Sequence, residues 1–253
     1  DVDTPIHITD PASAETIKYA ANGFLAMKIS FVNAVAAMCE AVGADVAAVV
    51  EGIGADQRIG TQFLRPGPGW GGSCFPKDSR ALVKIAEDHG YDFAMMRGVI
   101  DVNDEQLERM VDKIARAAGR PFHELSGVTV GVFGLTFKAG TDDLRESPAL
   151  AIIAALRANG ARVRAFDPTT VGELTEHHRS VLDGIELLDE ALAAAEGADV
   201  MAVFTEWPEF AKLDLAQLAA RSRPGVTIVD TRNLLDPAEV RAAGFDYDGV
   251  GRR

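Results

Sequence analysis

Apolar side chains in the first part of the chain recur with the spacing of an α-helix. Between Asp10-Pro11 and Gly43 they lie three and four positions apart, a period close to 3.6. The apolar positions are Ile17, Ala21, Phe24, Leu25, Phe31, Val32, Val35 and Met38. An Asp-Pro pair is typical of a helix start and glycine of a helix stop. The pattern therefore predicts one helix of about 30 residues and about 45 Å, long enough to bridge domains or build a dimer interface.

The rest of the first 120 residues also has a helical pattern, broken by one glycine-rich segment. Start and stop signals predict a helix over 45–52, another from Pro76 to about residue 88, and a third over 99–118. Residues 65–72 read RPGPGWGG, which neither helix nor strand tolerates. We therefore predict a loop whose backbone amides can approach a ligand closely, because few side chains intervene.

The pattern changes after Arg120-Pro121, where short β-rich runs begin. They cover residues 128–133, 162–166, 200–204 and 226–229, and alternate with helical stretches that open at Ser147, Asp189 and Asp236. Such alternation predicts βαβ units around a parallel sheet. The predicted fold class is α/β: a helical domain over residues 1–120, containing the long helix, and a Rossmann-like domain over residues 121–253.

Composition narrows the classes of function. The 253 residues include 38 acidic and 25 basic ones, a formal charge of −13, which argues against general DNA or RNA binding. Two cysteines do not make a disulfide framework, and the pair His177-His178 is not a metal signature. No run approaches about 18 apolar residues, so we expect no membrane span. No basic segment followed by an apolar one opens the chain, so we expect no leader and a cytoplasmic protein. We also expect no bound metal. Because the chain begins at Asp1 and not at Met, we expect it to be part of a longer protein.

The sharpest chemical signal is GGSCFPKD at residues 71–78. It places Cys74 just before a helix that starts with proline, where free amides, the helix dipole and Lys77 favour the nucleophilic thiolate. Asp78 falls in the first turn and can cap the helix or handle a proton near the sulfur. An inert cysteine beside a capping aspartate would give the same local pattern, but the glycine-rich loop favours the activated nucleophile. Cys39, in mid-helix, is expected in the core.

Isolated polar residues elsewhere become candidates only in combination with Cys74. Lys18 and Asn22 are four apart and share one face of the long helix. There a lysine could stabilise an oxyanion and an asparagine could orient water, although a solvated lysine and an ordinary helix asparagine would look the same. Lys138 and Arg145 follow the first strand, at the edge where open α/β sheets bind ligands, or are ordinary loop cations. No G-x-G-x-x-G motif follows any of the predicted strands; the run GPGWGG at 67–72 matches the letters but precedes a helix and follows no strand.

Taken in order, these motifs resemble one known family. Lys18-x-x-x-Asn22, DQRIG at 56–60, GGSCFPKD at 71–78, Phe137-Lys138 and RES at 145–147 follow one another. The same order is typical of the UDP-glucose 6-dehydrogenases, within the UDP-glucose/GDP-mannose dehydrogenase family. Members have an N-terminal NAD-binding Rossmann domain, a central helical dimerisation domain and a C-terminal Rossmann-like UDP-binding domain. The chain resembles the last two over essentially its whole length, so we expect the glycine motif to lie in an NAD domain absent from it.

The resemblance implies a reaction and a role for each matching residue. The family oxidises UDP-glucose to UDP-glucuronate in a four-electron reaction with NAD. Cys74 would form a thiohemiacetal and then a thioester, Lys18 would stabilise oxyanions, and Asn22 and Asp78 would position water and assist proton transfer. Substrate contacts are implied for Lys18, Asn22, Arg58, Phe63, Leu64, Arg65, Gly69, Trp70, Gly71, Phe137, Lys138 and Arg232. NAD contacts are implied for Cys74, Phe75, Pro76, Lys77 and Arg145.

The resemblance also implies a homodimer built through the long helix, with Arg58 reaching the substrate across the interface. Trp70 stands where relatives usually carry Phe or Tyr, which leaves the identity of the sugar open. A related dehydrogenase of GDP-mannose or of a UDP-N-acetylhexosamine is the first alternative. A binding and dimerisation module with no activity of its own is the second. A cysteine hydrolase or acyl transferase is the third, although no histidine carries a recognisable signature near Cys74.

Overall fold

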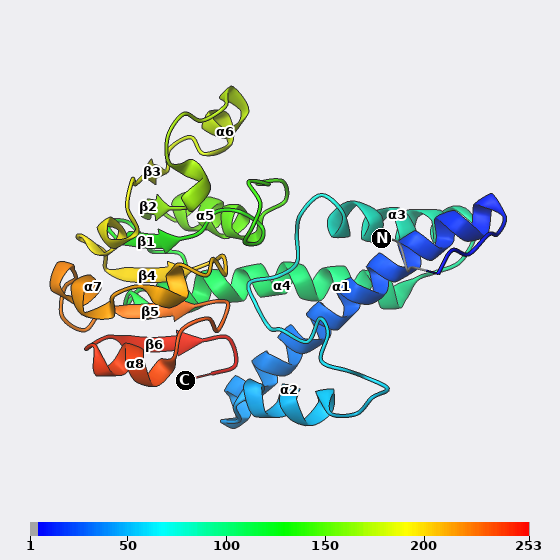
Figure 1. Cartoon of the computed structure of the whole chain (residues 1–253), viewed down its shortest axis with the longest axis horizontal. Helices are drawn as coiled ribbons and strands as arrows, with labels where there is room; N and C mark the ends of the chain where they lie inside the picture. Colours follow the sequence, from blue (N-terminus) through cyan, green and yellow to red (C-terminus); the bar gives the residue numbers. More distant parts are fainter. Residues whose placement is uncertain (1–4, 253) are drawn as a thin grey trace.

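Four helices make up the first half of the chain in the computed structural model, which describes residues 5–252 (Figure 1). They are α1 (Pro11–Val42), α2 (Val46–Gly54), α3 (Phe75–Asp88) and α4 (Ala94–Ala117). The Asp10 carboxylate accepts the Ser13 amide at 2.9 Å, and Gly43 ends α1 in the left-handed conformation with φ 76°. The predicted long helix and its two end signals are therefore confirmed.

A six-stranded parallel sheet makes up the second half, in the order β3-β2-β1-β4-β5-β6. Its strands are β1 (Thr129–Phe133), β2 (Arg162–Phe166), β3 (Glu186–Leu187), β4 (Val200–Val203), β5 (Thr227–Asp230) and β6 (Asp246–Gly249). The α-helices that follow α4 are α5 (Pro148–Ala158), α6 (Glu176–Val181), α7 (Leu215–Arg221) and α8 (Pro237–Ala242). The strand order reverses between β1 and β4, the position where open sheets of this class bind ligands.

Several elements differ from the sequence-based expectation. Strands β3 and β6 carry no apolar run: β3 has two residues, and β6 reads DYDG. The helix expected from Asp189 is a short 3₁₀ segment, Ala191–Ala195, because Glu196 is extended and Gly197 turns the chain with φ 70°. Helix α4 begins at Ala94, five residues before the predicted start, because no capping side chain marks its N-terminus.

Helix α4 joins the helical half to the sheet (Figure 1). Its last two turns bury Met110, Val111, Ile114 and Ala115, each at most 1% exposed, in the same apolar cluster as one face of the sheet. Cys39 on α1 is 1% exposed and belongs to that cluster, which confirms its expected core position. The two halves therefore share one core, and the carboxyl ends of β1, β4 and β5 are held near α1.

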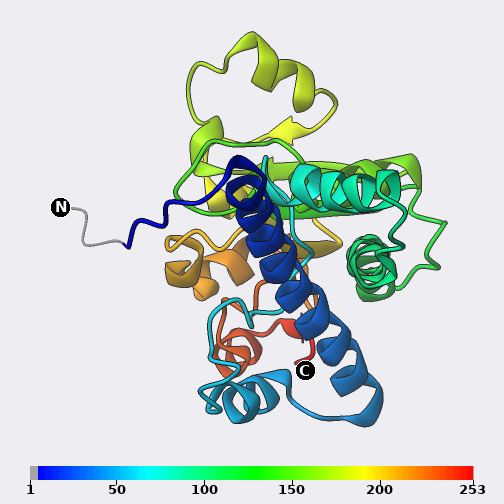
Figure 2. The same cartoon turned by 90° about the vertical axis from the view of Figure 1, so that its right-hand side faces the viewer.

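Helix α1 runs along the molecule from α3 to α2 (Figure 2). It packs against α3 and α4 and is also apolar enough, by length and composition, to cross a membrane. Its most apolar window has a mean hydropathy of 1.5, and 33% of that window is buried. Much of the apolar surface of α1 is therefore left uncovered by this chain.

Candidate active site

Cys74 is the N-cap residue of α3, and its side chain is exposed, in contrast to the buried Cys39. Pro76 occupies the start of the helix, as the sequence predicted, and Asp78 is the acidic residue of the first turn. The Ser73 hydroxyl lies 3.8 Å from the Cys74 sulfur. The thiol is thus presented to solvent at the positive end of a 14-residue helix.

Asp78 is the centre of a polar cluster that joins α3 to α1. Its carboxylate is fully buried and accepts a 2.7 Å hydrogen bond from the Asn22 amide. It also pairs with Lys18 at 3.3 Å and with Lys77. Burial raises the pKa of Asp78, but the hydrogen bonds from Lys77, Asn22 and Lys18 outweigh burial and hold the pKa below its usual range. The structure therefore brings Lys18, Asn22, Lys77 and Asp78 together close to Cys74.

The glycine-rich loop passes between the two halves of the molecule. Its Gly72 amide donates to the carbonyl of Glu146 at 3.3 Å. A Cβ on Gly71 would lie 2.0 Å from that carbonyl oxygen, so only glycine allows this approach. Glu146 itself has φ 49°, an uncommon conformation for a residue with a side chain. The side chain of Trp70 is 7% exposed and packs into the apolar cluster formed by α1, α3 and α4.

Arg232 links three loops at the carboxyl edge of the sheet. Its guanidinium donates to the carbonyls of Phe204 at 2.8 Å and Phe137 at 3.1 Å, and pairs with Glu206 at 3.1 Å. The Lys138 ammonium lies 5.3 Å from the centre of the Phe137 ring and is exposed. Phe137, Lys138 and Arg232 are thus brought together beside the glycine-rich loop, as the sequence predicted.

Two neighbouring cavities lie between Arg232 and residues 61–69. One, of about 520 Å³, is lined by Phe63, Leu64, Arg65, Gly69 and Arg232 among others. The second, of about 840 Å³, shares Leu64, Arg65 and Arg232 with the first. Phe63 also lies 6.4 Å, ring to ring, from Phe75 at the start of α3. The volumes are in the range of small-molecule sites.

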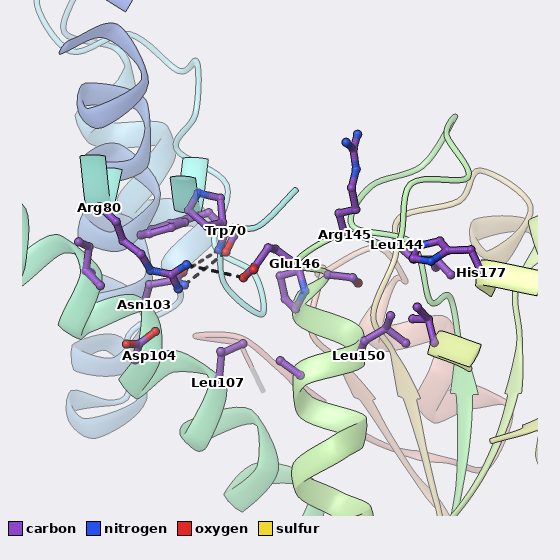
Figure 3. A pocket seen from close by; sticks show the side chains of 16 residues that line it. Trp70, Arg80, Asn103, Asp104, Leu107, Leu144, Arg145, Glu146, Leu150 and His177 are labelled. Atoms are coloured by element: carbon purple, nitrogen blue, oxygen red, sulfur yellow. Dashed lines mark hydrogen bonds and ion pairs between the residues drawn. The ribbon is translucent and has the colours of Figure 1, made fainter. Parts of the chain in front are cut away.

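Arg145 is held on the other side of the glycine loop, by two hydrogen bonds to Asp143 at 2.9 and 2.8 Å. Asp143 raises the pKa of Arg145 most, and the charge of Cys74 adds to the rise, so the thiol lies within electrostatic reach of this guanidinium. A third cavity, of about 390 Å³, lies beside Arg145 and Pro76 (Figure 3).

Arg58 is the one predicted site residue that the fold does not bring to the others. It follows α2, its side chain is 89% exposed, and it is held by Asp56 through hydrogen bonds of 3.0 and 3.1 Å. The expectation that Arg58 reaches the substrate across a dimer interface stays a prediction.

Several buried polar residues around the site have no sequence signature. Asp167 follows β2 and accepts the amides of Leu135 and Thr136 at 2.7 and 3.2 Å, which shapes the loop before Phe137. Lys113 on α4 is 4% exposed and pairs with Glu40 and Asp248 at 3.1 and 2.6 Å. Their partners are far away in sequence, so only the fold identifies them.

Two family models match the chain. Residues 12–105 match the central domain of the UDP-glucose/GDP-mannose dehydrogenase family, and residues 131–237 match the UDP binding domain of the same family. The chain belongs to the UDP-glucose/GDP-mannose dehydrogenase family. The predicted resemblance is therefore confirmed, and both domain types occur in the predicted order.

Curated members of the UDP-glucose/GDP-mannose dehydrogenase family are similar to the chain over nearly its whole length. A UDP-glucose 6-dehydrogenase of Rhizobium meliloti is 44% identical over 98% of the chain and 55% of its own length. One from Bacillus subtilis is 43% identical over 98% of the chain and 52% of its own length. The chain thus spans about half the length of the curated relatives it matches.

Solved structures of this family have the same fold. A UDP-glucose dehydrogenase from Pyrobaculum islandicum superposes with a TM-score of 0.85 at 35% identity, covering 100% of this chain and 54% of that one. An NDP-N-acetyl-D-galactosaminuronic acid dehydrogenase from Methanosarcina mazei gives a TM-score of 0.83 at 26% identity, covering 95% and 51%. The fold is therefore common to members that carry different substrate names.

Proposed function

We propose that the whole protein oxidises UDP-glucose to UDP-glucuronate with NAD, in two two-electron steps. The observation that carries the proposal is the exposed Cys74 thiol at the start of α3, beside the buried Asp78 with its partners Asn22 and Lys18. The 44% identity to a UDP-glucose 6-dehydrogenase supports the choice of substrate. We retain residues 1–120 as the central dimerisation domain and residues 121–253 as the UDP-binding domain.

Each residue of the Asp78 cluster has a role that its position allows. The Cys74 thiolate adds to the aldehyde carbon formed in the first oxidation, and the oxygen of the thiohemiacetal takes up negative charge. Lys18, whose side chain is 60% exposed, can turn from Asp78 to stabilise that oxyanion. The second oxidation leaves a thioester on Cys74. Asn22 and Asp78 orient a water molecule that adds to the thioester carbon, and Asp78 takes part in the proton transfer that restores the thiol and releases the carboxylate.

The residues near Cys74 fit NAD, whereas the sheet does not. Arg145 and Lys77 pair with Asp143 and Asp78, but their side chains are 66% and 63% exposed, and two exposed cations beside the thiol suit a dinucleotide pyrophosphate. Asp167 stands after β2, where dinucleotide folds place the acidic residue that binds ribose, but it is fully buried and occupied by backbone amides. Phe75, Pro76, Lys77 and Arg145 would therefore hold NAD at Cys74, with the rest of its binding supplied elsewhere in the whole protein. NAD accepts a hydride in each oxidation.

The UDP group is assigned to the carboxyl edge of the sheet. Arg232 and Lys138 supply positive charge for the diphosphate, and the loop from Phe63 to Gly71 supplies backbone amides and the walls of the cavities next to Arg232. This chain should bind UDP by itself and bind NAD weakly or not at all. Titration calorimetry with each ligand tests this, and tight NAD binding would contradict the assignment.

The second candidate function is oxidation of another nucleotide sugar. The Methanosarcina mazei structure, named for an N-acetyl-galactosaminuronic acid product, has almost the same fold, so the fold does not select the sugar. Turnover of the whole protein with a panel of UDP-glucose, GDP-mannose and UDP-N-acetylhexosamines decides between them. NADH formation with one of the others and none with UDP-glucose would overturn the proposal.

The protein acts as a homodimer in the cytoplasm, with α1 at the interface. Ile17, Phe24, Phe31 and Met38 are seven residues apart and between 55% and 59% exposed, which is the spacing of a helix–helix seam. A second copy that covers this stripe would explain why α1 is as apolar as a membrane-spanning helix, with no need for a membrane. It would also bring Arg58 to the site of the partner subunit.

A further inference from the structure

The glycine-rich loop obtains its backbone hydrogen bonds mainly from side chains. Residues 64–71 lie in no helix or strand. Within the described part of the chain, the backbone–backbone bonds to residues 65–72 reduce to the one between Gly72 and Glu146. Buried backbone groups need partners, so other groups must supply them. The partners come from α1 and α4.

Asn103 on α4 holds both backbone groups of Trp70 (Figure 3). Its side-chain oxygen accepts the Trp70 amide at 2.7 Å, and its side-chain nitrogen donates to the Trp70 carbonyl at 3.3 Å. Asn103 is 5% exposed. Gly69 has φ 124°, and a Cβ there would lie 3.0 Å from the Asn103 oxygen. Glycine at this position therefore allows the Asn103 side chain to approach the loop backbone closely.

Three more buried side chains complete the set. Asn33 accepts the Gly67 amide at 2.8 Å, and Gln106 donates to the Gly67 carbonyl at 2.7 Å. Ser30 accepts the indole N–H of Trp70 at 2.9 Å. These side chains are between 1% and 3% exposed. We call Ser30, Asn33, Asn103 and Gln106 the loop clamp.

We propose that the loop clamp consists of positioning residues for the nucleotide-sugar site, with Asn103 as the central one; this rests on the proposed function. The clamp residues are buried beneath the loop: Asn33, Asn103 and Gln106 hold its backbone, and Ser30 holds the Trp70 indole. Gly67 and Trp70, the two residues they fix, flank Gly69, and Trp70 leads directly into Gly71, Gly72 and Cys74.

The physical reason is that glycine and proline leave this loop without side chains that could hold it from outside. A misplacement of about 1 Å in a binding group can cost about 100-fold in rate. Replacing Asn103 by leucine, which has a similar size and no polar atoms, leaves the Trp70 amide without its partner. Replacing it by aspartate keeps an acceptor oxygen for the 2.7 Å bond but loses the 3.3 Å donor to the Trp70 carbonyl.

The test compares N103L, N103D and the control V111A in the whole protein. Val111 is a 1% exposed residue on the same helix, and its truncation weakens packing against the sheet without touching the loop. Steady-state kinetics with UDP-glucose are measured well below each melting temperature. The rate of Cys74 alkylation by iodoacetamide, without any ligand, is measured in parallel.

We expect N103L to raise KM for UDP-glucose about 30-fold with kcat changed less than about fivefold. The loop contacts the nucleotide sugar equally in the ground state and in the transition state, so a displaced loop weakens binding in both. N103D, which restores one of the two bonds, should have a lower KM than N103L, and V111A should change KM less than about threefold. The alkylation rate should change in N103L and not in V111A.

A KM for N103L within threefold of V111A, at similar melting temperatures, would overturn the positioning role. A wild-type protein that does not turn over UDP-glucose would count against the proposed function instead. The same variants are then compared with the nucleotide sugar that is turned over. The pair Ser30 and Trp70 gives an independent check. S30A should lower the free energy of unfolding much less in a W70F background, because no indole N–H is then left unpaired.

Discussion

Replacing Asp78 by asparagine is the substitution that most directly probes the polar cluster beside Cys74. The Asp78 carboxylate is fully buried and accepts a 2.7 Å bond from Asn22. A hydrogen bond to a charged group contributes about 1.5–3 kcal/mol to stability. The asparagine amide of D78N can still accept a neutral hydrogen bond from Asn22, which contributes about 1 kcal/mol. Lys18 and Lys77 are 60% and 63% exposed, so water screens their attraction and their loss adds little. We expect D78N to lower the free energy of unfolding by about 1–2 kcal/mol.

The stability difference should depend on pH in one direction. The pKa of Asp78 lies below its ordinary value of 3.8 in the folded protein, so the carboxylate stabilises the fold above that value. The contribution is lost as the pH falls through the folded pKa. Urea denaturation of wild type and D78N at pH 7, 5 and 3 should therefore give a constant difference at pH 7 and 5 and a smaller one at pH 3.

Turnover separates the structural part of Asp78 from its proposed chemical part. We expect D78N to reduce kcat with UDP-glucose by about 100-fold, the size of a general acid–base contribution, with UDP affinity unchanged. The matched control is D88N, which removes an exposed carboxylate from the same helix and should leave stability and turnover unchanged. A D78N protein with kcat within threefold of wild type, or a stability difference that grows at pH 3, would refute the reasoning.

Three further predictions follow from single contacts. K113L should lower the free energy of unfolding by about 1–2 kcal/mol in urea denaturation, because the Glu40 carboxylate loses its 3.1 Å partner Lys113 but keeps Arg109 and the Gly251 amide; a loss below about 0.5 kcal/mol would contradict this. F31E should halve the mass of the assembly in light scattering while the control Y91E, at an equally exposed site, leaves it unchanged; an unchanged mass for F31E would exclude α1 as the interface. R232K should weaken UDP binding about tenfold in calorimetry, since lysine keeps the charge and loses the fork that Arg232 uses, and unchanged affinity would contradict its assignment.

The main architecture could be predicted because its signals are local. The apolar period lies within the helix that it predicts, and the end signals Asp10 and Gly43 lie at its two ends. Helix α1 accordingly has the predicted bounds within a few residues. The Cys74, Asp78, Lys18 and Asn22 cluster could be predicted because a motif and a helix spacing name its members.

The loop clamp and the ion pairs of Lys113 with Glu40 and Asp248 could not be predicted, because the partners are distant in sequence. Asn103 is 33 residues from Trp70, and Lys113 is 135 residues from Asp248. A single asparagine or lysine in an amphipathic helix looks like a solvated residue until the fold shows what it faces. The position of Trp70 could not be predicted either. The sequence does not reveal that the indole packs between the helices, while the backbone of Trp70 forms part of the loop.

The central claim is that Cys74 carries the sugar as a covalent intermediate between the two oxidations. The most direct measurement is the yield of NADH and UDP-glucuronate from UDP-glucose in the whole protein, for wild type and C74A, with mass spectrometry of the acid-quenched wild-type enzyme. We expect two NADH per UDP-glucuronate and an acyl adduct on Cys74 in the wild type, and no UDP-glucuronate from C74A. Wild-type turnover by C74A would contradict the account.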